Sequence, residues 1–331
     1  MDIKGKKIMV IGGAGLIGSH IVDQLLQTDV KEVVVYDNFV RGRMENLAGA
    51  LKDPRCSVFP LGGDICQPDI LDTAMKGVDG VFHLAALWLL HCHEYPQSAF
   101  DVNIRGTFNV IEACRRHTIQ RLVYSSSASV YGDALEEPMT ESHPFNCWTF
   151  YGATKIAGEA MLKAHHKRYG VKGVGLRYMN VYGPRQDYKG AYIAVMMKAL
   201  DCIDRNEPPL VFGDGSQAYD FIHVADVARA NLCAMASECP IGFFNVGRGV
   251  KTSVKELIEV LLKLTGKESL GINFKPATEY FVTNRVGCEK AAREKLGFEW
   301  KIDLEEGLQS LIEWRQAHMA EVEARRGAAG R

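Results

Sequence analysis

The chain has 331 residues, enough for one large α/β domain and a smaller second one. Its apolar content of 47% and charged content of 24% are ordinary for a globular protein, and the net charge of −1 gives no reason to expect nucleic acid or an anionic membrane as a partner. There is no apolar run of membrane-spanning length, no room for a signal peptide before the first strand and no paired spacing among the nine cysteines. These features predict a cytoplasmic protein with reduced thiols.

A glycine-rich turn follows the first predicted strand. Residues 8–11 are apolar and too few for a helix, the turn comes next, and residues 17–26 form an amphipathic helix. Strand, turn and helix together place backbone N–H groups and the positive end of a helix dipole at one point, where a pyrophosphate can bind. The sequence therefore predicts a dinucleotide site in which the contacts come from Gly12, Gly15, Leu16, Ile17 and Gly18.

The second predicted strand, residues 33–36, ends in Asp37. A carboxylate at this place accepts a hydrogen bond from a ribose 2′-hydroxyl and repels a 2′-phosphate, so the predicted cofactor is NAD rather than NADP. Asn38 is assigned to the same cofactor site. Arg41 and Arg43 follow closely and keep NADP open as an alternative.

Strands and helices alternate through the first half of the chain, which predicts an α/β fold with a parallel, doubly wound sheet. Further strands are expected at 57–61 and 80–84. Such sheets bind ligands at the carboxyl ends of their strands, so the following residues are assigned to the cofactor: Asp64, Ile65, Leu84, Ala85 and Ala86. Asp64 is expected to touch the adenine, with a helix cap as the alternative. Asn103, in a helix predicted over 99–116, faces either the cofactor or solvent.

Residues 87–96 contain Trp88 and the run His91-Cys92-His93. A structural zinc site uses four ligands, usually in two separated pairs, and no second pair is evident in the sequence, so no metal is predicted. We expect a loop at the mouth of the site, in which Trp88, His91 and His93 contact the substrate. A plain surface loop is the alternative.

Tyr151 and Lys155 are four residues apart, which places them on one face of a helix. A tyrosine with a pKa of about 10 is a weak base at neutral pH, but a neighbouring ammonium and a positive nicotinamide favour the phenolate. A strand predicted at 121–125 leads into serines, of which Ser125 is assigned to the cofactor and Ser127 to a substrate hydroxyl. Together these residues predict a base for an alcohol whose carbon loses a hydride.

Four stretches carry a resemblance to a known family: GGAGLIG at 12–18, HLAA at 83–86, SSSASVYG at 125–132 and YGATK at 151–155. With them the chain resembles the extended short-chain dehydrogenases/reductases over nearly its whole length, to about Trp314. Among these it most resembles the NAD-dependent nucleotide-sugar epimerases and dehydratases, and especially UDP-glucose 4-epimerases. The resemblance implies a Rossmann domain with seven parallel strands, a smaller substrate domain and a homodimer packed through pairs of helices.

The resemblance also implies roles for single residues. Tyr151 is the catalytic base, Lys155 lowers its pKa and binds the nicotinamide ribose, Ser127 contacts the sugar hydroxyl, and Asn180 binds the phosphates of the nucleotide sugar. The chain departs from the pattern at Tyr219, where many relatives carry an arginine against the diphosphate.

Two arginines are candidates to replace that missing charge. Arg285 is expected at the diphosphate, with a surface ion pair as the alternative. Arg185 follows a Gly-Pro turn and either contacts the diphosphate or, with His91 and His93, accepts a carboxylate at C6 of the sugar.

The chain is expected to return to the sheet near Phe243, so that the two domains interleave. The predicted NAD-binding domain takes residues 1–180 and about 221–247. The predicted nucleotide-sugar domain takes about 181–220 and 248–316, and residues 317–331 are expected to be a frayed tail.

The leading hypothesis is a UDP-sugar 4-epimerase that acts by transient oxidation at C4. Ala128 and Ser129 stand where related 4,6-dehydratases carry acidic residues, which argues against dehydration. The alternatives are a UDP-glucuronate 4-epimerase or another uronate-modifying oxidoreductase or decarboxylase, and a non-catalytic NAD-binding regulator. The sequence does not name the sugar or the nucleotide, and a neutral or N-acetylated hexose is favoured.

Overall fold

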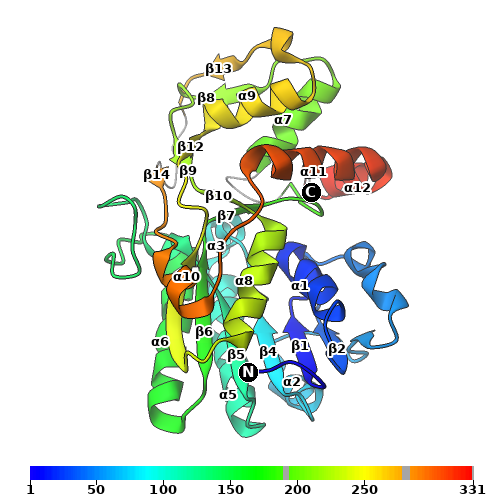
Figure 1. Cartoon of the computed structure of the whole chain (residues 1–331), viewed down its shortest axis with the longest axis vertical. Coiled ribbons are helices and arrows are strands. Elements are labelled where there is room, and N and C mark those ends of the chain that lie inside the picture. The colour runs from blue at the N-terminus through cyan, green and yellow to red at the C-terminus, as the bar shows by residue number, and fades with distance from the viewer. Residues whose placement is uncertain (189–193, 278–283, 330–331) are drawn as a thin grey trace.

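The computed structural model describes residues 1–188, 194–277 and 284–329. Its centre is one parallel sheet of seven strands (Figure 1). In spatial order the strands are β11 (Ile241–Val246), β6 (Gly173–Tyr178), β5 (Arg121–Ser127), β4 (Gly80–His83), β1 (Lys7–Ile11), β2 (Glu32–Tyr36) and β3 (Cys56–Val58). The order runs outward in both directions from β1, which confirms the predicted doubly wound Rossmann sheet.

Helices cover both faces of this sheet, and the strand sequences show why. In β1 the side chains of Ile8 and Val10 belong to one core, and those of Met9 and Ile11 to the other. The first core is closed by α1 (Leu16–Leu26), α8 (Val224–Ala236) and α10 (Lys290–Leu296). The second is closed by α2 (Pro68–Ala74), α5 (Thr107–Arg116) and α6 (Phe150–Tyr169).

A smaller region stands above the carboxyl ends of the strands (Figure 1). Its helices are α7 (Ala194–Asp204), α9 (Val254–Leu264) and α11 (Leu304–Ala317). Its short strands pair as β7 (Asn180–Tyr182) with β10 (Phe221–His223), β8 (Leu210–Phe212) with β13 (Asn273–Lys275), and β9 (Ala218–Tyr219) with both β12 (Thr252–Ser253) and β14 (Asn284–Arg285). A third core, which includes Leu257, Phe221 and Leu311, holds this region together.

The structure corrects three expectations. The segment 87–96 is not a loop, because it forms helix α3 (Leu89–Glu94), followed by α4 (Pro96–Ala99) and a π-helical stretch that leads into α5. Residues 290–298 pack into the core of the sheet, not into the substrate domain. The predicted frayed tail is helix α12 (Met319–Ala329), and its Val322 is fully buried. The tail was misjudged because its few apolar residues gave a weak amphipathic pattern.

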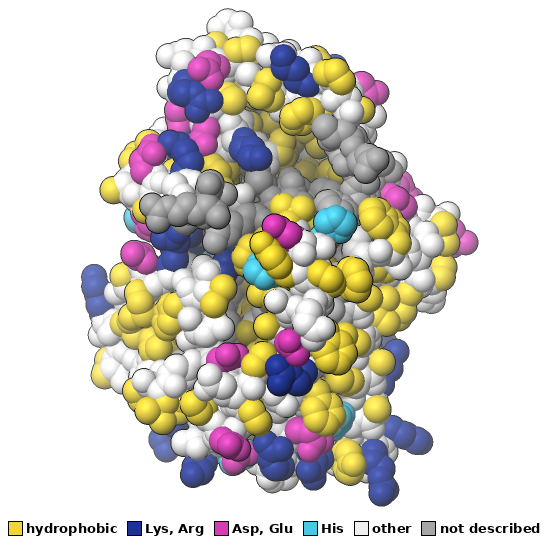
Figure 2. Space-filling model, turned by 180° about the vertical axis from the view of Figure 1, so that it is seen from behind, with side chains coloured by type: hydrophobic (Ala, Val, Ile, Leu, Met, Phe, Trp, Pro, Cys, Tyr) yellow, Lys and Arg dark blue, Asp and Glu magenta, His cyan; other side chains and the backbone are white. Residues whose placement is uncertain are grey.

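One face of the molecule carries charges of both signs. On the face seen in Figure 2, acidic and basic side chains are interspersed, in keeping with a net charge of −1. Within the part of the chain that the structure describes, no helix has the length and apolar character needed to cross a membrane.

Candidate active site

A cavity of about 400 Å³ lies at the carboxyl ends of β1, β4 and β5, which is where open parallel sheets hold ligands. It is lined from both regions of the molecule. The residues that were assigned to the cofactor or substrate and that line it are Gly12, Gly15, Leu16, Ile17, Gly18, Asp37, Asn38, Ile65, Leu84, Ala85, Ala86, Trp88, Ser125, Ser127, Tyr151, Lys155, Asn180, Arg185 and Arg285.

The glycine turn is shaped by close contacts that only glycine allows. Gly12 has φ +80°, and a Cβ there would lie 2.7 Å from the backbone nitrogen of Ala85. A Cβ on Gly18 would lie 2.2 Å from the carbonyl oxygen of Gly12, so the start of α1 packs directly on the turn. Gly15 is the N-cap of α1, and its lack of a side chain leaves the first backbone N–H groups facing the cavity. This arrangement fits the pyrophosphate of a dinucleotide.

Asp37 is fixed at the end of β2. Its Oδ2 accepts a hydrogen bond from the N–H of Ala14 at 2.9 Å, and its Oδ1 accepts one from the N–H of Phe39 at 2.8 Å. Burial raises the pKa of this carboxyl. Asp37 lines the cavity together with Asn38, where a ribose hydroxyl can reach it. Arg41 also lines the cavity, where it is bound to Asp187 in a bidentate ion pair at 2.6 and 3.0 Å.

Asp64 lies apart from the main cavity. It lines a neighbouring hollow that it shares with Asp37 and Asn38. Its Oδ1 accepts a hydrogen bond from the N–H of Cys66 at 2.8 Å, which closes a local turn. The helix-cap alternative is wrong, since α2 begins after Gln67. Ile65, by contrast, lines the main cavity.

Ser127, Tyr151 and Lys155 meet at the end of β5. Helix α6 begins beside this strand end, where the Thr149 hydroxyl accepts a hydrogen bond from the N–H of Gly152 at 3.1 Å. Ser127 and Tyr151 both line the cavity, with Ser127 near enough to lower the pKa of the phenol, and Lys155 Nζ donates to the Ser125 carbonyl oxygen at 2.7 Å. Lys155 Nζ lies 5.5 Å from the centre of the Tyr151 ring.

Burial changes the proton affinities of both groups. It raises the pKa of Tyr151 to about 12, against the smaller opposing effects of the Ser127 hydrogen bond and the charges of Arg41 and Arg285. It lowers the pKa of Lys155 to about 8. In the protein alone, burial thus outweighs the nearby positive charges, and the expectation that Lys155 together with a positive nicotinamide favours the phenolate stays a prediction for the complex with the cofactor. A phenolate there requires further positive charge, which a bound nicotinamide would supply.

Asn103 was expected to face either the cofactor or solvent, and it does neither. It is 2% exposed and is not among the described residues that line the cavity. Its Oδ1 accepts a hydrogen bond from the N–H of Leu87 at 2.7 Å, and its Nδ2 donates to Thr154 Oγ1 at 3.2 Å. It thus ties the segment after β4 to the helix that carries Tyr151. The sequence around Asn103 could not indicate this contact, because Thr154 is about fifty residues away in the chain.

The histidines of α3 do not converge on the substrate side. Trp88 lines the cavity, with the guanidinium of Arg41 4.9 Å from its ring centre. The ring of His91 packs between those of Trp88 and Tyr95 at centre distances of 4.8 and 5.0 Å. Neither His91 nor His93 belongs to the described lining of the cavity, and their contact with the substrate stays a prediction. In the described part of the chain, no cluster of three or more His, Cys, Asp or Glu side chains is arranged for a metal ion.

The arginines divide between the two ends of the cavity. Arg185 forms an ion pair with Asp23 of α1 at 2.7 Å, and its Nη1 has no hydrogen-bond partner among the described residues. Arg185 therefore lies next to α1. His91 and His93, with which it was expected to accept a C6 carboxylate, are not in the described lining of the cavity. Arg285 is 5% exposed and acts electrostatically on Tyr151, so the surface ion-pair alternative is wrong.

Asn180 and Tyr219 also lie at different places. Asn180 lines the cavity at the start of β7, and its Nδ2 donates to the Asp220 carbonyl oxygen at 3.3 Å. Tyr219 is outside the described lining, because its side chain packs in the third core against Phe221. Tyr219, which was predicted among the substrate residues, is paired in register with Arg285 of the neighbouring strand β14.

Sequence reasoning missed some residues that line the cavity, among them Arg41, Gln186, Asp187 and Arg325. Gln186 and Asp187 directly follow the Gly-Pro-Arg turn, which was the only available signal for them. Arg325 comes from α12 and had no signal, because the helix itself was not predicted.

A doubly wound sheet with a glycine turn, an aspartate after β2 and a Ser-Tyr-Lys group at one cavity defines a nicotinamide-dependent short-chain dehydrogenase/reductase. The chain belongs to the NAD dependent epimerase/dehydratase family, whose model matches residues 8–247. NAD is accordingly its cofactor.

Three relatives illustrate this similarity. The UDP-glucose 4-epimerase of Halalkalibacterium halodurans is 32% identical over 330 residues, covering 94% of this chain and 96% of that protein. The UDP-N-acetylglucosamine 4-epimerase of Methanobrevibacter ruminantium M1, solved with UDP-N-acetylmuramic acid, is 33% identical with a TM-score of 0.89, over 96% of this chain and 100% of that one. The UDP-glucuronic acid 4-epimerase of Bacillus cereus, solved with UDP-glucuronic acid and NAD, is 27% identical with a TM-score of 0.85, over 94% and 99% of the two chains.

Proposed function

We propose that this protein is an NAD-dependent UDP-sugar 4-epimerase that acts by transient oxidation at C4. The observation that carries the proposal is the meeting of Ser127, Tyr151 and Lys155 in the cavity that also holds the glycine turn. A non-catalytic NAD-binding regulator has no need of a phenol that shares the cavity with a serine and lies beside a buried ammonium. The relatives named as 4-epimerases support the same choice.

In this mechanism Tyr151 removes the proton of the C4 hydroxyl while Ser127 holds that hydroxyl by a hydrogen bond. NAD, held by the glycine turn and Asp37, would supply the hydride chemistry at C4. Tyr151 then gives the proton back. Lys155 is held by the Ser125 carbonyl at 2.7 Å, which keeps its ammonium beside the Tyr151 ring.

The same residues disfavour dehydration. Elimination of water needs acidic side chains next to the catalytic serine, and Ala128 and Ser129 stand there instead. Ala128 is fully buried, and the Ser129 hydroxyl that lines the cavity is not acidic near neutral pH. Without loss of water, the 4-keto sugar is reduced again at C4. Reduction on the opposite face of the ring gives the C4 epimer.

We assign the diphosphate of the nucleotide sugar to Arg285 and Asn180. Arg285 in β14 is directly paired with Tyr219 in β9, the position at which the resemblance led us to expect an arginine. Unlike the Tyr219 side chain, which packs in the third core, the Arg285 side chain lines the cavity. It lines the cavity together with Asn180.

We propose a neutral or N-acetylated hexose as the sugar. A uronate site was expected to combine Arg185 with His91 and His93 around the C6 carboxylate. Arg185 is instead paired with Asp23, and the two histidines are outside the described lining. UDP-glucuronate is the second candidate, because the guanidinium of Arg41 also lies in the cavity and acts on Tyr151. The Bacillus cereus relative acts on that sugar by its name.

The test is incubation of the protein with UDP-glucose, UDP-N-acetylglucosamine and UDP-glucuronate, with separation of the products. An epimer without net NADH is expected, and its rate on the three sugars identifies the substrate. Net NADH or loss of carbon dioxide would favour an oxidoreductase or decarboxylase. An absence of product from all three sugars, in a protein that retains NAD, would favour the regulator.

We further propose a homodimer packed through α5 and α6, which lie side by side. Phe108 on α5 and Tyr169 on α6 are 44% and 55% exposed, and a partner surface would cover them. Light scattering should give the mass of a dimer for the protein and of a monomer for Phe108→Glu. A monomer in both cases would contradict the proposal. The nine free cysteines support a cytoplasmic location.

A further inference from the structure

The C-terminal helix α12 brings an arginine into the dinucleotide cavity. Arg325 lines the cavity and is only 3% exposed. Its Nη2 donates a hydrogen bond to Asn46 Oδ1 at 2.6 Å, and its Nη1 donates one to the Arg185 carbonyl oxygen at 2.8 Å. One side chain from the end of the chain therefore binds two segments on opposite sides of the cavity.

Asn46 connects this arginine to the glycine turn. The Nδ2 group of Asn46 donates to the carbonyl oxygen of Ala14 at 2.7 Å. The N–H of Ala14 in turn donates to Asp37 at 2.9 Å. Arg325, Asn46, Ala14 and Asp37 form a continuous hydrogen-bonded series, which ends on the two elements that the family fold uses to hold a dinucleotide.

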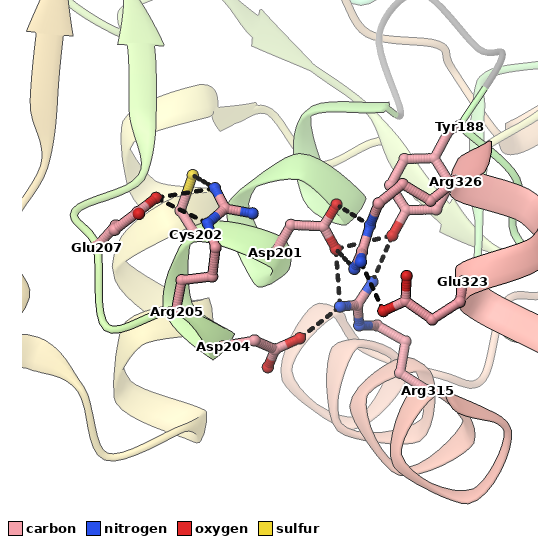
Figure 3. Close-up of polar contacts among 9 residues, drawn as sticks. All are labelled: Tyr188, Asp201, Cys202, Asp204, Arg205, Glu207, Arg315, Glu323 and Arg326. Atoms are coloured by element: carbon pink, nitrogen blue, oxygen red, sulfur yellow. Dashed lines mark hydrogen bonds and ion pairs between the residues drawn. The ribbon is translucent and has the colours of Figure 1, made fainter. Parts of the chain in front are cut away.

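Helix α12 itself is anchored to the other region of the molecule. Figure 3 shows Arg326 paired with Asp201 of α7 at 2.7 Å, beside Arg315 of α11, which binds the same carboxylate at 2.9 Å. Val322 is fully buried in the third core. The guanidinium of Arg325 also lies 5.3 Å from the centre of the Trp314 ring. The backbone of Arg325 thus belongs to the smaller region above the sheet, while its guanidinium reaches the sheet domain.

We propose that Arg325 is a positioning residue for the bound dinucleotide. It holds the glycine turn and the segment at Arg185 in place around the cofactor site, so that NAD exchanges only when α12 moves away. Its guanidinium is also paired with Glu321 of the same helix, so it acts mainly through its hydrogen bonds to Asn46 and to the Arg185 carbonyl. The inference rests on the NAD binding of the family and not on the sugar named in the proposed function.

The experiment measures release of NAD from the full-length holoenzyme without any sugar. Each holoenzyme is diluted into a solution of an NAD-degrading enzyme, which destroys released NAD, and the NAD still bound is measured over time. The unmodified protein is compared with Arg325→Ala, Arg325→Lys and Arg293→Ala. Arg293 is the control, since its side chain is 49% exposed and pairs with Glu289 outside the cavity. Loss of a charge-assisted contact predicts that Arg325→Ala releases NAD at least about tenfold faster. Arg325→Lys should restore part of the retention, and Arg293→Ala should release NAD at the original rate.

Equal release rates in Arg325→Ala and the original protein would overturn the inference, and so would a fall in melting temperature with unchanged release. If Arg325→Ala does not fold, Arg326→Ala decides, because it loosens α12 at Asp201 without entering the cavity. Faster release from that variant supports the inference, and unchanged release overturns it. Epimerase activity is measured in a separate assay. The NAD release rates therefore test this inference even if the protein does not epimerise a UDP-sugar.

Discussion

Arg285→Ala tests the idea that the missing diphosphate arginine has moved to a neighbouring strand. Arg285 is 5% exposed, lines the cavity and is aligned with Tyr219 across β14 and β9. Its backbone oxygen accepts a hydrogen bond from the N–H of Asp220 at 2.9 Å, a contact that alanine keeps. The substitution should therefore remove the guanidinium and leave the strand pairing intact.

The expected loss follows from the contact that disappears. A hydrogen bond to a charged group contributes about 1.5–3 kcal/mol, so kcat/KM for the UDP-sugar should fall about 10- to 150-fold. A diphosphate contact is made equally in the bound and the reacting sugar, so most of the loss should appear in KM. A further, smaller fall in kcat is expected because the charge of Arg285 lowers the pKa of Tyr151.

The assay is steady-state epimerisation with product separation, together with the NAD content of each preparation. Arg205→Ala is the matched control, since Arg205 pairs with Glu207 at 2.8 Å on the surface and its side chain is 53% exposed. A change in kcat/KM below about twofold in Arg285→Ala would refute the assignment. So would a loss explained entirely by missing NAD, because the guanidinium would then serve the cofactor.

Three further predictions concern cofactor choice, the glycine turn and pH. Asp37→Ala should narrow the preference for NAD over NADP in a binding titration, since repulsion of a 2′-phosphate is lost, and an unchanged preference would contradict this. Gly18→Ala should abolish co-purification of NAD, because its Cβ would meet the Gly12 oxygen at 2.2 Å, whereas Gly49→Ala, with open space around it, should retain NAD. Burial raises the pKa of Asp220 from 3.8 to about 6, so this group's contribution to the free energy of unfolding falls as pH rises through that window. Asp220→Asn should flatten the corresponding pH dependence of Tm, and the same slope in both proteins would count against it.

The sequence predicted those features that depend on local pattern. The glycine turn, the buried strands and Asp37 lie within one strand–turn–helix–strand unit, so spacing alone located them. Tyr151 and Lys155 were paired correctly because four residues make about one helical turn.

Features that depend on distant contacts were not predictable in the same way. The role of Asn103 is set by Leu87 and Thr154, and the direction of Arg185 by Asp23, none of which the local sequence indicates. The raised pKa of Tyr151 in the protein alone could not be predicted for a related reason: burial of the phenol outweighs the nearby charges, and burial is a property of the whole fold.

The central claim is that the C4 hydrogen leaves as a hydride and returns to the same carbon, with Tyr151 as the base. The most direct measurement uses a UDP-hexose deuterated at C4 and mass spectrometry of the epimer. The account predicts that the epimer keeps deuterium at C4 without net NADH. Tyr151→Phe should retain NAD and turn over about 100- to 10,000-fold more slowly. Loss of the deuterium to water, or near-normal turnover by Tyr151→Phe, would contradict it.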